Sequence, residues 1–147
     1  MSLLLGTKNF ASQTVEANEI VSLGSVYRRY CKRVNGLRTF DFDSTEVILQ
    51  STGVYHITAT AVASATAAGN VTLSLYENGL AIPGAFSTET ITTPTTELRT
   101  FTIDYYVLVD STCVLGCNSV VNKAISLVNT GVEAVYSSVV LNVEKVL

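Results

Sequence analysis

The chain has 147 residues, of which 48% are apolar and only 14% are charged, and its formal net charge is −3. This length suits one domain that buries enough surface to fold without a metal or disulfide framework, and no apolar run approaches the ~20 residues that a membrane-spanning helix needs. An apolar excess of this kind predicts that part of the exterior is covered by other copies of the chain or by a partner.

Residues 1–12 are predicted to form an N-terminal tail. Their opening, Met-Ser-Leu-Leu-Leu-Gly, is too short for a signal peptide and lacks a basic lead segment, so we expect synthesis in a cytoplasm. Residues 1–38 carry six basic and two acidic side chains, whereas residues 39–147 carry three basic and ten acidic ones. Opposite charges separated in this way can orient neighbours in an assembly.

Residues 13–147 read as one all-β domain, because apolar side chains recur there with a period of two. Val54, His56 and Thr58 alternate with Tyr55 and Ile57, which is typical of a half-buried strand. Turn signals such as Asn78-Gly79 punctuate the chain, and short strands at this spacing indicate a sandwich or barrel. Strands are predicted near residues 13–16, 19–28, 38–42, 46–50, 53–64, 70–77, 80–85, 97–109, 112–116, 122–128 and 134–146, with a Thr-rich exposed loop at 86–96.

A basic, tyrosine-containing segment at residues 27–33 is the most unusual local feature. Three interpretations stay open: a rim that docks on an acidic protein neighbour, a plain solvated surface, or a site for nucleic acid, since cations pair with phosphates and tyrosines stack on bases. The acidic overall balance argues against nucleic acid as the main partner. The predicted docking residues are Arg28, Arg29, Lys32, Arg33 and Arg38.

Few side chains could support catalysis or metal binding. His56 is the single histidine, too few for a zinc site or a nucleophilic triad, and we expect a structural or surface role for it. Cys113 and Cys117 are predicted to be reduced core thiols, with a disulfide as the alternative. Cys31 has basic neighbours that can lower the pKa of a thiol, but without a base or a pocket it is interpreted as structural.

Asp41 and Asp43 share one strand face if their segment is extended, and two such carboxylates could help to hold calcium. No Asp-rich calcium loop follows them, and the chain has neither a Gly-rich phosphate loop nor a nucleophile elbow. We therefore expect no metal, no cofactor and no enzymatic activity. A cupin-like or glycan-cleaving enzyme is the disfavoured alternative.

From about residue 38 onward, the order of motifs resembles the jelly-roll superfamily of tumour necrosis factor (TNF) and the complement globular heads. The motifs are Gly53-Val54-Tyr55-His56-Ile57, the strand ending in Asn78-Gly79, Tyr105 to Val109 leading into Asp110, Ile125 to Gly131, and a closing strand through Leu141, Val143 and Val146. The resemblance implies a two-sheet antiparallel jelly-roll sandwich. It also implies a homotrimer around a three-fold axis and no catalysis.

Similar domains occur in bacteriophage virions, so the sequence favours a structural virion protein: a trimeric capsid decoration, head-fibre or baseplate component docked on a larger assembly. The trimer interface is expected at Tyr105, Val107 and Val109, or at the opposite-facing Tyr106 and Leu108, and the sequence leaves open which set faces inward. The alternative is a glycan- or receptor-binding module of a fibre tip or cell surface, with contacts from loops 66–70, 86–96 and 129–134.

Overall fold

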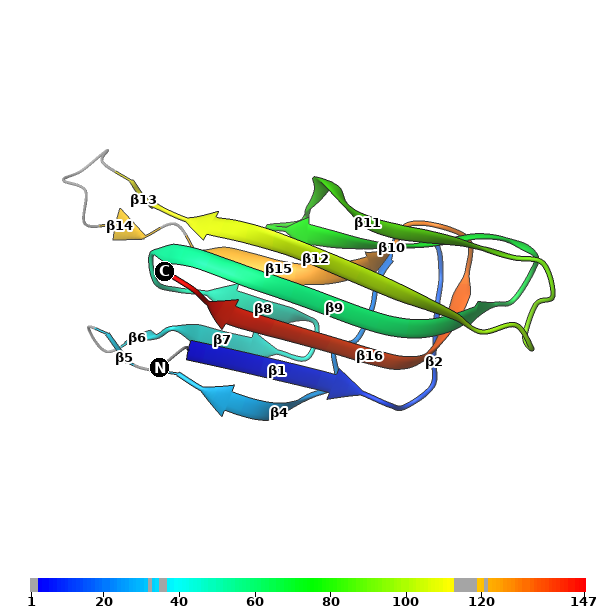
Figure 1. The fold of residues 1–147 in the computed structure, drawn as a ribbon, viewed down its shortest axis with the longest axis horizontal. Helices are drawn as coiled ribbons and strands as arrows, with labels where there is room; N and C mark the ends of the chain where they lie inside the picture. The colour runs from blue at the N-terminus through cyan, green and yellow to red at the C-terminus, as the bar shows by residue number, and fades with distance from the viewer. Residues whose placement is uncertain (1–2, 32, 35–36, 113–118, 121) are drawn as a thin grey trace.

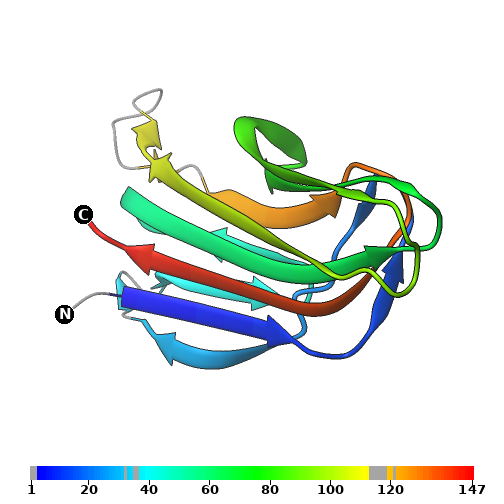
Figure 2. The ribbon, with the colours of Figure 1, turned by 45° about the vertical axis from the view of Figure 1, so that its right-hand side comes forward.

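The computed structural model describes residues 3–31, 33–34, 37–112, 119–120 and 122–147. These residues form two antiparallel sheets that face each other as two layers (Figures 1 and 2). Within these ranges, no helix is long and apolar enough to cross a membrane.

Sheet A contains the chain's two terminal strands. Its order is β12–β9–β16–β1–β4, and the short β2 also pairs with β16. β1 pairs with β16 along its whole length, from Leu3 opposite Lys145 to Asn9 opposite Val139, so both chain ends lie at one end of the sandwich (Figure 1). The bounds are β1 (Leu3–Asn9), β2 (Gln13–Val15), β4 (Ser25–Tyr30), β9 (Gly53–Ala65), β12 (Arg99–Val109) and β16 (Ala134–Lys145).

Sheet B has the order β11–β10–β15–β8–β7, and the short β3 pairs with β15. Its bounds are β3 (Glu19–Ile20), β7 (Phe40–Asp43), β8 (Glu46–Leu49), β10 (Gly69–Glu77), β11 (Leu80–Ile91) and β15 (Lys123–Asn129). Two small ladders lie outside the sheets, β5 (Arg33–Val34) with β6 (Leu37–Arg38) and β13 (Ser111–Thr112) with β14 (Ser119–Val120).

The chain repeatedly crosses between the layers. After β8 in sheet B it forms β9 in sheet A, returns for the β10–β11 hairpin, and then alternates through β12, β15 and β16. Strands adjacent in a sheet are therefore mostly distant in sequence, as in a jelly-roll sandwich. This confirms the predicted fold class.

The core lies between the sheets because alternate side chains of each strand face inward. In sheet A, β9 contributes Tyr55 and Ile57, and β16 contributes Leu141 and Val143, all fully buried. Sheet B supplies its own buried set, including Val47, Leu73, Leu75, Ile125 and Leu127. Burial of aliphatic and aromatic side chains from both layers is the main force that holds a sandwich together.

The Asn78-Gly79 signal is a two-residue hairpin loop, as predicted. Glu77 pairs with Leu80 across it, and the φ angles of Asn78 and Gly79 are 51° and 78°. Positive φ at both central positions defines the type I′ turn, whose twist matches that of the flanking strands.

The predicted N-terminal tail is wrong for residues 3–9. They form β1, which is paired on both sides, with β16 and β4, and its Leu5 is fully buried. The short apolar run at the start of the chain is therefore part of the core, and removing it would leave one side of β16 without its neighbour.

Two other boundaries differ from the expectation. Residues 86–91, predicted as loop, continue β11 because cross-strand threonine contacts extend the ladder, such as Thr72 Oγ1 to Thr88 Oγ1 at 2.8 Å. The strand predicted at 19–28 is two strands, since the chain passes from sheet B to sheet A between Ile20 and Ser25. Of the strand predicted at 112–116, only Thr112 lies within the described residues.

Candidate interaction surfaces

The outward face of β12 carries the first candidate surface. Val107 and Val109 are 2% and 1% exposed and pack into the core, whereas Tyr106 and Leu108 are 59% and 54% exposed. Alternation along the strand sends these two pairs to opposite sides. Of the two sets that the sequence left open, the structure places Tyr106 and Leu108 on the exterior of sheet A.

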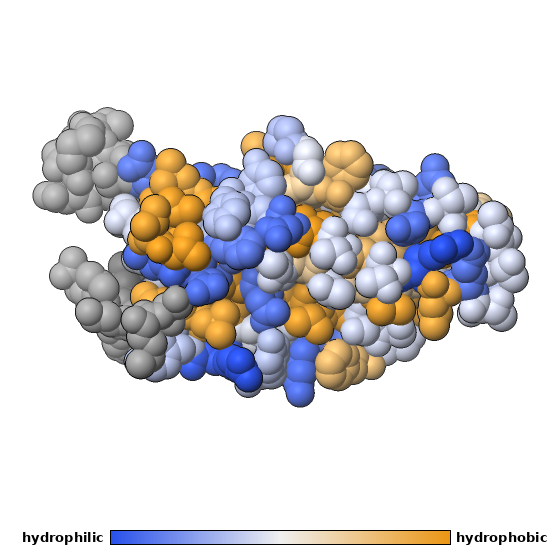
Figure 3. Space-filling view, viewed as in Figure 1, coloured by the Kyte–Doolittle hydropathy of each residue, from blue (hydrophilic) through white to orange (hydrophobic). Residues whose placement is uncertain are grey.

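Figure 3 shows an apolar patch at the end of sheet A where β12 and β16 end. Leu108 lies near that end of β12 and is exposed. Leu108 is paired with Val54 of β9, and the backbone N–H of Val146 donates to the Val54 carbonyl at 2.8 Å. Leu147 completes the patch and is 79% exposed. An exposed group of aliphatic side chains on one face is typical of a protein–protein contact.

Beside this patch, His56 contacts the ring of Tyr106 and the carboxylate of Asp104. Its ring stacks on Tyr106, with the centroids 4.6 Å apart, and its Nε2 lies 2.5 Å from Asp104 Oδ1. Glu144 is the residue opposite His56 on β16. The imidazole side chain is 26% exposed, so His56 has a surface position on sheet A, one of the two roles that the sequence predicted.

Tyr105 lies at the edge between the two sheets. It is half-buried and lines a hollow of about 380 Å³ between β11 and β12, together with Leu80, Ile82 and Leu108. The hollow joins the outer face of β12 to the exposed edge of sheet B. Glu77 of β10 also lines the hollow, so its surface is mixed polar and apolar and does not simply continue the apolar patch.

The second candidate surface is the edge strand β4 with the segment that follows it. Tyr27, Arg28, Arg29 and Tyr30 are all exposed there. Tyr27 is held in place because its hydroxyl donates to Asn142 Oδ1 at 2.7 Å and its ring covers Gly6, where a Cβ atom would lie 2.8 Å from the ring.

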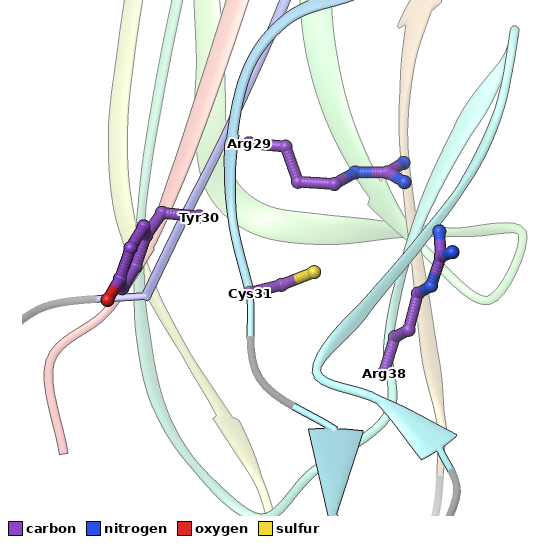
Figure 4. A pocket seen from close by; sticks show the side chains of 4 residues that line it. All are labelled: Arg29, Tyr30, Cys31 and Arg38. Atoms are coloured by element: carbon purple, nitrogen blue, oxygen red, sulfur yellow. The ribbon is translucent and has the colours of Figure 1, made fainter.

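Arg29 and Arg38 come together in a hollow of about 390 Å³, which Tyr30 and Cys31 also line (Figure 4). Of the other predicted docking residues, Lys32 lies outside the described residues and the side chain of Arg33 is not among those described. Within the described part of the chain, Cys31 is a free, half-buried thiol that lines the hollow. Cys113 and Cys117, and the prediction about their pairing, lie outside the described residues.

Asp41 and Asp43 both lie on β7 and are exposed, but their carboxylates serve the local backbone. Asp41 Oδ1 accepts from the N–H of Phe42 at 2.9 Å, and Asp43 Oδ1 accepts from the N–H of Thr45 at 3.3 Å in the β7–β8 turn. In the described ranges no group of three or more histidine, cysteine or acidic side chains is placed to hold a metal ion.

Comparisons with known proteins agree with this architecture. No family model and no curated protein sequence matches the chain. Among solved structures, Eiger TNF from S. frugiperda superposes with a TM-score of 0.63 at 10% identity, covering 100% of this chain and 92% of its own. The globular domain of zebrafish complement 1qA superposes with a TM-score of 0.60 at 7% identity, covering 99% of this chain and 98% of its own.

The chain has a TNF-like jelly-roll fold. The same fold is found in the vertex protein P5 of the phage PRD1, which matches with a TM-score of 0.52 at 16% identity over 99% of this chain and 97% of its own. The resemblance read from the motifs is thus confirmed for the fold.

At the end of the sandwich away from the two chain termini, the β9–β10, β11–β12 and β15–β16 loops lie together. The N–H of Thr66 in the β9–β10 turn donates to the Glu133 carbonyl, and the N–H of Thr95 in the β11–β12 loop donates to the Ala65 carbonyl at 3.0 Å. The loops expected to carry a ligand are thus assembled at one end, although only residues 92–96 of the predicted 86–96 region lie outside the strands.

Sequence reasoning did not identify the His56–Asp104 pair, the apolar patch around Leu147, or the hollow between Arg29 and Arg38. The first two depend on the β12–β9–β16 register, which joins residues far apart in the sequence, such as His56 and Asp104 at a separation of 48 positions. No local motif specifies that register. For the hollow between Arg29 and Arg38, the sequence shows the cluster of basic residues, but it does not show that these two side chains extend into the same hollow.

Proposed function

We propose that the chain is a non-enzymatic structural protein of a bacteriophage virion, which acts as a homotrimeric capsid decoration, head-fibre or baseplate component. The observation that carries the proposal is the likeness to the phage vertex protein P5 over nearly the whole of both chains. The exposed apolar surface described above supports a role in assembly. In such a role the chain is a component of the virion, made in the host cytoplasm.

The trimer interface is proposed on the outer face and edge of β12. Tyr106 and Leu108 contribute exposed contact area, Tyr105 lines the adjoining hollow, and Val107 and Val109 support the strand from the core. Tyrosine is enriched among the few central residues that supply most of the binding free energy of an interface, and burying the leucine side chain removes further apolar surface from water. The low charged fraction of the chain supports the same conclusion.

The docking surface toward the larger particle is proposed at the basic end of the sandwich, with Arg28, Arg29 and Arg38 and the neighbouring Lys32 and Arg33. Arg28 and Arg29 lie on an exposed edge strand, and Arg28 stacks against Tyr27 at 5.9 Å from the ring centroid. Arginine is favoured at interfaces because its planar head both stacks and forms paired hydrogen bonds.

Sedimentation velocity of the full chain at micromolar concentration tests the trimer. We expect a single species with three times the mass of the chain. A monomer would contradict the proposal. Negative-stain microscopy of purified virions labelled with an antibody against the chain would then locate it, and labelling absent from virions would contradict the virion assignment.

A glycan- or receptor-binding module is the second candidate, favoured by the meeting of the β9–β10, β11–β12 and β15–β16 loops at one end. Binding residues are often carried on loops that a rigid scaffold holds together. A glycan array probed with the full chain is the test. Binding that is lost on changing Thr95 and Thr96 to alanine would support this candidate, and an array without any signal would remove it.

A further inference from the structure

The hollow beside β4 presents two arginines that have no acidic partner among the described residues. Arg29 comes from the edge strand of sheet A and Arg38 from β6, and both side chains extend toward the same space, with the Cys31 thiol beside them (Figure 4). Tyr30 also borders the hollow, but its ring points the other way. Arg29 and Arg38 take no part in the ion pairs seen between described residues, such as Arg99 with Glu97 and Lys123 with Glu77. Two guanidinium groups of like charge thus line one hollow.

Such a pair favours an oxyanion between the two groups. Each guanidinium presents a rigid fork of N–H donors that matches the two oxygens of a carboxylate or a phosphate. An anion placed between two cations removes their repulsion and gains charge-assisted hydrogen bonds from both. The volume of the hollow, about 390 Å³, admits the end of one acidic side chain.

We propose that the Arg29–Arg38 pocket binds a carboxylate presented by an acidic segment of a partner protein. The inference rests on the proposed docking function and names the chemistry that the docking surface recognises. A protein carboxylate is favoured over a nucleic acid because the pocket is local. Binding a phosphate backbone needs a long track of basic side chains. Residues 39–147 instead carry ten acidic side chains, which would repel phosphates, and only three basic ones.

The test uses fluorescein-labelled hexaglutamate as the probe, with anisotropy measured on the full chain at low ionic strength. Arg29→Gln and Arg38→Gln should each weaken binding about tenfold or more, since a hydrogen-bonded charge pair is lost. Arg29→Lys keeps the charge but loses the fork, and should weaken binding several-fold. Lys8→Gln, which removes an exposed cation of β1 outside the pocket, should change affinity less than ~2-fold.

Cys31 supplies a local readout. In a chain with Cys113→Ser and Cys117→Ser, hexaglutamate should slow the alkylation of Cys31 by iodoacetamide, and Arg38→Gln should abolish that protection. Circular dichroism and thermal melting of each variant establish that it is folded, and the exposed positions of Arg29 and Arg38 favour this.

Several outcomes would overturn the inference. If Lys8→Gln and Arg29→Gln weakened hexaglutamate binding equally, long-range attraction by the basic side chains, and not the pocket, would account for the binding. An oligothymidylate that binds more tightly than hexaglutamate through the same arginines would make the pocket a nucleic-acid site. Inorganic phosphate that competes at equal concentration would make it a site for free ions.

The sedimentation experiment separates this inference from the proposed function. Arg29→Gln should leave the trimer intact, since the pocket lies on β4 and not on β12. A trimer that does not bind hexaglutamate would overturn the pocket alone, and a monomer that does bind it would overturn the proposed assembly alone.

Discussion

Asn129 shows how one polar side chain can fasten three segments of a sandwich. It is fully buried at the end of β15, its Nδ2 donates to the carbonyls of Val15 at 3.0 Å and Val132 at 2.9 Å, and its Oδ1 accepts from the Tyr136 hydroxyl at 3.1 Å. A fully satisfied buried amide stabilises the fold, but each partner left alone carries a desolvation penalty.

Replacing Asn129 with alanine should therefore lower the free energy of unfolding by about 2–4 kcal/mol, because two carbonyls and a hydroxyl lose their partner. Tyr136→Phe, which removes only the hydroxyl, should cost about 1 kcal/mol. Urea unfolding followed by circular dichroism measures both. Asn70→Ala, at an exposed position, is the matched control, and its free energy of unfolding should stay within ~0.5 kcal/mol of the parent. If Asn70→Ala and Asn129→Ala lowered the free energy of unfolding equally, the buried hydrogen bonds of Asn129 would not explain the loss.

Tyr136 also predicts a dependence of stability on alkaline pH. Burial of its hydroxyl raises the pKa of Tyr136 far above the usual value of a tyrosine. Above pH ~10 the unfolded chain loses this proton while the folded chain keeps it, so the free energy of unfolding falls as pH rises. The loss reaches at most ~1.4 kcal/mol per pH unit for one such group.

Tyr136→Phe should remove this contribution. Between pH 10 and 11 the stability of the variant is expected to fall less steeply than that of the parent, as measured by urea titrations at each pH. Tyr55, whose pKa burial also raises although Ser51 hydrogen bonds oppose the shift, remains in both chains and cancels in the comparison. Parallel pH slopes for the two chains would contradict the prediction.

At the scale of an element, Glu97 closes the β11–β12 loop. Its carboxylate accepts from the backbone N–H of Thr92 at 2.9 Å and of Thr93 at 3.3 Å, and from Arg99 at 2.8 Å. The backbone hydrogen bond from Thr92, followed by those from Arg99 and Thr93, lowers the pKa of Glu97 to about 2. The bonds favour the ionised carboxylate, so protonation must loosen the loop.

The closure is therefore expected to hold above pH ~4.5, the value of an unperturbed glutamate, and to be lost as pH falls toward 2. Hydrogen exchange of residues 92–98, corrected for intrinsic rates, should accelerate in this window. Glu97→Gln should show faster exchange already at neutral pH and no acid transition, while Glu89→Gln on β11 should behave like the parent. Exchange of this loop that does not change with pH would exclude the role given to Glu97.

The strands and turns differ in how far sequence can predict them. Asn78-Gly79 specifies its own turn, because only a few residue types adopt two positive φ angles in succession. β1 has no such signal, since its partner β16 begins more than a hundred residues later and pairing is decided by the shared core. Residues 86–91 were not recognised as strand for the same reason: the ladder to β10 extends a segment whose composition alone is typical of a loop.

The two candidate surfaces likewise differ in how much of them the sequence alone predicts. Alternation along residues 105–109 separated an inner from an outer set, but the sequence could not say which was which until the position of sheet B was known. The basic cluster was visible directly as residue types. The convergence of Arg29 and Arg38 was not, because it depends on how β6 lies beside the edge strand β4.

At the scale of the whole molecule, the apolar and basic surfaces lie on different parts of one sandwich. The outer side of β12 and the chain end carry exposed apolar side chains, while the opposite edge of sheet A carries the arginines of β4. A subunit of this kind can contact its own copies through one surface and a larger particle through the other. The two contacts should then be separable by mutation.

Leu108→Lys and Tyr106→Lys test this separation. Both side chains are more than half exposed in the protomer, so a lysine there should leave the fold and its melting temperature nearly unchanged. In a trimer interface the same lysine would be buried without a partner, which costs several kcal/mol and should shift the sedimentation profile to monomers at micromolar concentration.

Leu98→Lys is the matched control, since Leu98 is 60% exposed but lies just before β12, at the other end of that strand. It should sediment as the parent does. If the trimer persists in both Leu108→Lys and Tyr106→Lys, the interface lies elsewhere on the sandwich. If Leu98→Lys also sediments as a monomer, the added charge disrupts the assembly regardless of its position, and the outer side of β12 is not specifically the trimer interface.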